Sequence, residues 1–130
     1  MITLDTNVLA RALVDDPAAP AQCAAVRKRL AREDQVFVPV VVQVELVWVL
    51  ETAFELDKAE VLAVLDHLHA NRVFVLENEP AYAAALAEFR NGNTGFADDL
   101  ILMAARSHNA ALLTFDRKLG RLPGAQILAA

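Results

Sequence analysis

The sequence has few of the features that mark secreted, membrane-spanning or disulfide-stabilised proteins. It contains one cysteine, Cys23, so no disulfide can form within the chain. No run of eighteen uninterrupted apolar residues occurs, and the first residues lack the basic and apolar regions of a secretory signal. We therefore expect a cytoplasmic protein with no membrane span, in which Cys23 is a small, half-buried or buried thiol without a catalytic role.

Basic residues are also scarce. Twelve Lys and Arg residues against seventeen Asp and Glu residues give a formal net charge of −5, whereas nucleic-acid-binding proteins usually carry a basic surface. The total charge argues against RNA binding. That argument loses weight if several acids surround a divalent cation, because the cation would reverse the local potential that a phosphate group meets.

Internal repeats, low-complexity tracts and Gly/Ser-rich linkers are absent too. A chain of 130 residues is the usual size of one domain, and 56% hydrophobic residues are enough to form a continuous core. The sequence therefore predicts a single compact domain over residues 1–130.

Short apolar or β-branched runs alternate with longer helical patterns along the chain. The predicted strands are residues 2–4, 36–38, 73–76, 112–115 and 126–128. The predicted helices are residues 7–14, 18–32, 40–54, 58–70, 80–91 and 96–109. This alternation predicts an α/β fold, a parallel sheet of about four to five strands flanked by helices on both faces, with ligands at the carboxyl ends of the strands.

Aspartates follow two of the predicted strands. Asp5 ends the first strand and precedes Thr6 and Asn7, and Asp116 follows the fourth strand two residues after Thr114. A strand-end aspartate is well placed to hold a ligand. Either carboxylate could instead cap the next helix or turn without any functional role.

Glu45 lies in the middle of residues 40–50, a segment that is apolar nearly all round and is expected to be largely buried as a helix. No Lys or Arg lies within a helical turn of Glu45. An ionised carboxylate in such a place needs a cation, an ion-pair partner or a wet cleft. A place at the exposed edge of the helix is the alternative.

Asp98 and Asp99 open the last predicted helix, where acids also complement the helix dipole. Only one of them should face a cleft, because neighbours on a helix point about 100° apart. Asp98 shares an apolar stripe with Ile101 and Leu102. Asp99 lies seven residues before Arg106, which marks the expected solvent side, so we select Asp98 as the site residue.

Carboxylates gathered at one site would repel one another unless a cation neutralised them. Ligands that are all oxygen favour Mg²⁺, with Mn²⁺ as a substitute. Zinc is disfavoured, because His67 and His69 have the wrong spacing for a common helix face and His108 lies near the end of another helix.

Four segments, residues 2–7, 44–50, 96–101 and 113–116, resemble the successive motifs of the PIN domain family in order and spacing. The resemblance extends over essentially the whole chain. It implies that Asp5, Glu45 and Asp98 are the core metal-binding acids and that Asp116 is a fourth, more variable one. It also implies supporting roles for Thr6, Asn7 and Thr114. The position after Asp98, often small or apolar in the family, is Asp99 here.

The same resemblance implies Mg²⁺-dependent hydrolysis of RNA phosphodiester bonds, with 5′-phosphate and 3′-hydroxyl products. Basic residues beyond Asp99 are expected to contact the substrate: Arg106, Arg117, Lys118 and Arg121. A solvated surface charge is the alternative for any one of them. A single-stranded loop of a structured RNA is the expected substrate, because its bases can splay out. The chain further resembles VapC toxins of VapBC toxin-antitoxin pairs, which implies a homodimer neutralised by a cognate VapB-type antitoxin.

Two other functions fit part of the pattern. Phosphoryl transfer through an aspartyl-phosphate at Asp5 suits a strand-end acid but leaves Glu45 unexplained. A non-catalytic interaction module, whose acids bind a basic partner peptide, predicts no metal-dependent activity and binding that survives chelation.

Overall fold

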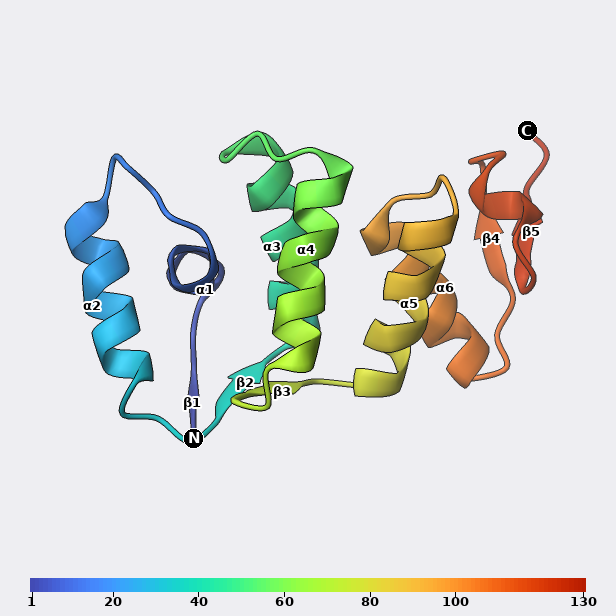
Figure 1. Ribbon diagram of the computed structural model, residues 1–130. Helices are drawn as coiled ribbons and strands as arrows, with labels where there is room; N and C mark the ends of the chain where they lie inside the picture. The colour runs from blue at the N-terminus through green and yellow to red at the C-terminus, as the bar shows by residue number, and fades with distance from the viewer. The chain divides into compact units, whose positions relative to one another are not determined.

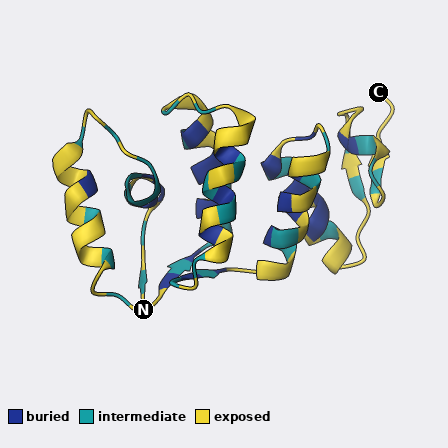
Figure 2. Cartoon of the chain, viewed as in Figure 1, coloured by how far each residue is buried: buried dark blue, intermediate teal, exposed yellow.

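The computed structural model describes residues 1–130 and consists of two compact units, Met1–Glu77 and Asn78–Ala130. Each unit combines helices with parallel strands and has buried residues of its own (Figures 1 and 2). None of the helices combines the length and the apolar character that crossing a bilayer requires.

The first unit contains three strands and four helices. In chain order they are β1 (Ile2–Thr3), α1 (Thr6–Leu13), α2 (Pro20–Leu30), β2 (Val36–Val38), α3 (Val40–Thr52), α4 (Lys58–Ala70) and β3 (Phe74–Leu76). The strands form one parallel sheet in the order β1-β2-β3, with Ile2 opposite Val36 and Val36 opposite Phe74. Helix pairs connect the strands, since parallel neighbours need a crossover between them.

Local sequence signals explain where these helices begin. Asp5 caps α1, with its carboxylate accepting a hydrogen bond from the Val8 amide. Pro20 occupies the first position of α2, where its missing amide hydrogen costs no helical hydrogen bond. Asp57 and Glu60 form a reciprocal capping box at the start of α4. The first residues of α1, α2 and α4 are therefore explained by capping or proline residues at those positions.

The core of the first unit is formed by aliphatic residues from β2, α1, α3 and α4. Leu9, Val36, Leu46, Leu50 and Leu65 are each at most 1% exposed. One polar side chain, Gln43, is also fully buried on α3. Its amide nitrogen donates to the Val38 carbonyl at 3.1 Å and to the Glu77 carbonyl at 3.0 Å, and so ties α3 to the ends of β2 and β3.

The second unit contains two longer helices followed by a small sheet. Its elements are α5 (Glu79–Asn91), α6 (Phe96–Ser107), β4 (Leu112–Thr114), the 3-10 helix η1 (Leu119–Arg121) and β5 (Ala125–Ile127). The β4 and β5 strands pair in parallel. Phe96 of α6 contacts two aromatic rings of α5 edge-on, Tyr82 at 5.6 Å and Phe89 at 5.9 Å between ring centres.

The predicted α/β architecture with parallel strands is confirmed. All five expected strands and all six expected helices are present, with bounds that differ from the predicted ones by a few residues. The strands are divided between a three-stranded and a two-stranded sheet. Cys23 is buried, as the sequence indicates.

The expectation that α3 is largely buried is wrong for one of its faces, and the alternative of Glu45 at the exposed edge of the helix is realised. Val41 is 62% exposed and Trp48 is 65% exposed, and Glu45 lies on the same exposed face. The opposite face, with Leu46 and Leu50, carries the core contacts. A helix composed almost wholly of apolar residues has no periodicity that reveals its buried side.

Replacing Leu46 by alanine should lower the free energy of unfolding by about 2–5 kcal/mol, because the substitution leaves a cavity in the core. Glu51→Ala on the exposed face of the same helix is the matched control and should change stability by no more than about 0.5 kcal/mol. Urea denaturation followed by circular dichroism measures both. Equal effects of the two substitutions would contradict this assignment of the core.

Candidate functional site

Asp5 lies two residues after the end of β1 and is exposed at the start of α1. Its Oδ1 accepts the hydrogen bond from the Val8 amide at 3.0 Å. Asp5 therefore caps α1, which is the alternative role that the sequence left open. It engages one carboxylate oxygen, and Oδ2 takes no part in that bond, so capping and ligand binding are compatible at this residue.

Glu45 is linked to the start of α1 through Thr6. Thr6 is the residue after Asp5. Its hydroxyl donates to Glu45 Oε1 at 3.4 Å. Thr6 itself is buried, with 8% of its surface exposed. Packing of α1 on α3 therefore brings the neighbourhoods of Asp5 and Glu45 together within the first unit.

Asp98 and Asp116 share a depression in the second unit. Its volume is about 370 Å³, and its lining includes Thr94, Arg117 and Lys118. Asp98 is half-buried in the first turn of α6, and Asp116 is exposed just after β4. This unit thus brings together two of the acids that the sequence singled out, with two basic side chains beside them.

The conformation of Asp116 is defined by hydrogen bonds on both sides. Its Oδ1 accepts from the Leu119 amide at 2.8 Å, and its own amide donates to Thr114 Oγ1 at 3.0 Å. Asp116 therefore opens the following turn, which is the alternative that the sequence left open for this residue. As at Asp5, the capping bond uses one carboxylate oxygen and leaves the other outside that bond.

The expectation that Asp99 faces solvent is wrong. The sequence placed Asp99 on the solvent side because it aligns with Arg106, yet Asp99 is 0% exposed and accepts a hydrogen bond from the Thr94 hydroxyl. Alignment with the exposed Arg106 therefore does not place Asp99 at the solvent surface. Its Nε donates to the Pro123 carbonyl at 2.7 Å, so it anchors the turn before β5.

Thr94 is a residue that the sequence reasoning missed. It is 8% exposed, bonds Asp99 and lines the depression that contains Asp98 and Asp116. Its position in the turn at residues 92–95, immediately before α6, is a signal that could have identified it, because hydroxyl side chains favour such turns.

The donor set fits a hard divalent cation in its chemistry. Asp5, Glu45, Asp98 and Asp116 offer only carboxylate oxygens, which Mg²⁺ prefers. The salt bridges within the units involve other acids, as in Arg27 with Asp15 and Arg29 with Glu33, and none of the four candidates pairs with Lys or Arg in its own unit. No group of three or more carboxylate, imidazole or thiol side chains is assembled for metal binding.

Asp99→Ala should destabilise the second unit by about 1–3 kcal/mol, because it leaves the buried Thr94 hydroxyl without its acceptor. Asp98→Ala, at a half-buried position, should have a smaller effect on the urea midpoint. A larger loss of stability for Asp98→Ala than for Asp99→Ala would contradict the structural role of Asp99.

Comparisons with known proteins agree with the motifs. The family model described as the PIN domain matches residues 2–125, nearly the whole chain. A search of curated proteins finds no match. On the extent of the family match, the chain belongs to the PIN domain family, whose members are generally nucleases.

Proposed function

We propose that the protein is a Mg²⁺-dependent endoribonuclease in which Asp5, Glu45, Asp98 and Asp116 bind the metal, with Mn²⁺ as a possible substitute. The observation that carries the proposal is the PIN domain match over residues 2–125, which includes all four acids. The absence of a basic ion-pair partner for each acid within its own unit supports it. A carboxylate without a basic partner has no neighbouring cation to offset its charge, so it is open to a metal ion.

Each of the four acids would have its own role. Asp5 and Glu45 would hold the cation, with the Glu45 carboxylate oriented by the Thr6 hydroxyl. Asp98 would be a third ligand. Asp116, whose carboxylate is held by the Leu119 amide, would bind a second ion or orient the attacking water. When bound, the metal supplies Lewis-acid activation of water and neutralises charge that develops on the phosphate.

Arg117 and Lys118 are the basic residues that support an RNA substrate most directly, since both line the depression with Asp98 and Asp116. Positive side chains beside carboxylates attract phosphate groups despite the negative net charge of the chain. The proposed substrate is a structured RNA cut in a single-stranded loop, with 5′-phosphate and 3′-hydroxyl products.

The proposed biological role is that of a VapC-type toxin in a type II toxin-antitoxin pair. The role is supported by the resemblance of a PIN domain of this length to VapC toxins. It includes a homodimer and a cognate VapB-type antitoxin as partners.

Purified protein should cut total cellular RNA at discrete sites with Mg²⁺ or Mn²⁺ and should lose this activity in EDTA. Asp5→Asn should lower the rate at least ~100-fold, because loss of a direct ligand costs more than the 10–100-fold typical of its hydrogen-bonded supports. Asparagine also caps helices, so α1 should stay intact. Asp34→Asn, at an exposed acid outside the candidate site, is the matched control.

Cleavage that persists in EDTA, or that Asp5→Asn and Asp34→Asn reduce equally, would overturn the assignment of Asp5. No metal-dependent cutting across a broad RNA panel would instead favour the non-catalytic module that binds a basic peptide.

Expression of the wild-type chain in bacterial cells should arrest growth if the protein is a toxin, and Asp5→Asn should relieve the arrest. Co-expression of the cognate antitoxin should restore growth to the wild-type chain. Unimpaired growth with a protein that cleaves RNA in vitro would reject the toxin role and leave the nuclease assignment standing.

A further inference from the structure

We propose that the pocket between α1 and α2 receives one unpaired base of the RNA substrate, next to the nucleotide whose phosphate is cleaved. The pocket has a volume of about 450 Å³ and lies within the first unit. That volume falls in the range of roughly 300–1,000 Å³ in which small-molecule sites are found. The inference rests on the proposed nuclease function and adds a recognition site to it.

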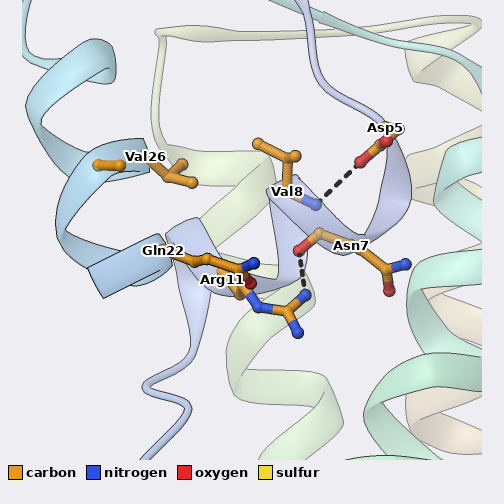
Figure 3. A pocket seen from close by; sticks show the side chains of 7 residues that line it. Asp5, Asn7, Val8, Arg11, Gln22 and Val26 are labelled. Carbon is orange, nitrogen blue, oxygen red and sulfur yellow. Dashed lines mark hydrogen bonds between the residues drawn. The ribbon is translucent and has the colours of Figure 1, made fainter. Parts of the chain in front are cut away.

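The position of the pocket connects it to the candidate metal-binding residues. Asp5 lies at one end of the lining, and Arg11 lies six residues further along the chain (Figure 3). The helix rise of ~1.5 Å per residue separates the two by about 9 Å along the axis. A nucleotide whose phosphate lies near Asp5 can therefore place an adjacent base along α1 toward Arg11.

The lining combines apolar walls with polar groups that have no partner in the pocket. Val8 of α1 and Val26 of α2 supply the apolar surface. No hydrogen bond joins the Asn7 or Gln22 carboxamide to another residue drawn in Figure 3. Both residues are exposed, so a ligand in the pocket can meet their amides without breaking a hydrogen bond within the lining.

The electrostatics favour a neutral base over a free phosphate. The Arg11 guanidinium is already opposed by Asp16 at 3.5 Å, and its Nη1 donates to the Asn7 carbonyl at 3.3 Å. The Asp5 carboxylate at the end of the pocket would repel an anion that entered without a metal ion. What remains is an apolar slot with uncharged amides, which suits the flat faces and polar edge of a base.

The carboxamides also indicate what can be recognised. Each one both donates and accepts hydrogen bonds, so it can pair with the mixed donor and acceptor edge that every RNA base presents. We therefore expect the pocket to require a base at one position beside the cut, whatever its identity.

The test measures kcat/KM for a short RNA that the wild-type protein cleaves, with a single abasic nucleotide placed in turn at each position around the cut. Ala25→Phe projects a ring into the pocket from the exposed side of α2, and Gln22→Ala removes one amide. Ala24→Phe is the matched control, since Ala24 is also exposed but does not line this pocket.

One abasic position should lower kcat/KM of the wild type and of Ala24→Phe about 10-fold or more, a size typical of a lost base–protein contact. The same abasic change should have little further effect in Ala25→Phe and a reduced effect in Gln22→Ala. Effects of base removal that are equally large in Ala25→Phe and Ala24→Phe would overturn the base pocket while the nuclease assignment stands.

Binding of the same RNAs in EDTA, followed by fluorescence anisotropy, separates the two proposals. Weaker binding of the abasic RNA to the wild type, lost in Ala25→Phe, would support the pocket even if no cleavage were found. Absence of both cleavage and base-dependent binding would reject both proposals together.

Discussion

Parallel pairing of β1 with β2 is the interaction on which the geometry of the first unit depends. Ile2 pairs with Val36 and Thr3 with Phe37, so both strands run in the same direction and end at the same edge of the sheet. The chain leaves that edge twice, once into α1 and once into α3. Asp5 and Glu45 are brought to one neighbourhood because their helices start from adjacent strands, and the Thr6–Glu45 hydrogen bond is a consequence.

Three acids of the first unit form ion pairs with arginine, whereas the four candidate site acids do not. Asp15, Asp16 and Glu33 are each paired with an arginine, as expected for acids that stabilise a surface or a loop. The four candidate site acids have no such partner in their own units. Asp5 and Asp116 instead accept a hydrogen bond from a backbone amide, which orients a carboxylate without neutralising it. The net charge of −5 therefore says less about RNA binding than the distribution of the partners does.

Arg11 stabilises the end of α1 beside the proposed base pocket. Its terminal nitrogens hold Asp16 and the Asn7 carbonyl. The proposed base pocket and the proposed metal ligands share Asp5, so binding of a base and alignment of the neighbouring phosphate would be linked.

The sequence by itself determined the helices and strands, because their signals are local. The cap at Asp5, the proline at the start of α2 and the capping box at Asp57 each act within one turn of the chain. The order of the motifs also identified the family and the four candidate acids.

Only the tertiary structure decided which faces are buried. The burial of Asp99 depends on Thr94 and on the packing of α6 on α5, and the exposed face of α3 depends on where its neighbours lie. The α1–α2 pocket likewise requires two helices separated by a loop, so no single segment could reveal it. Burial is a property of contacts between distant segments, and local periodicity cannot specify it where a helix is apolar on every side.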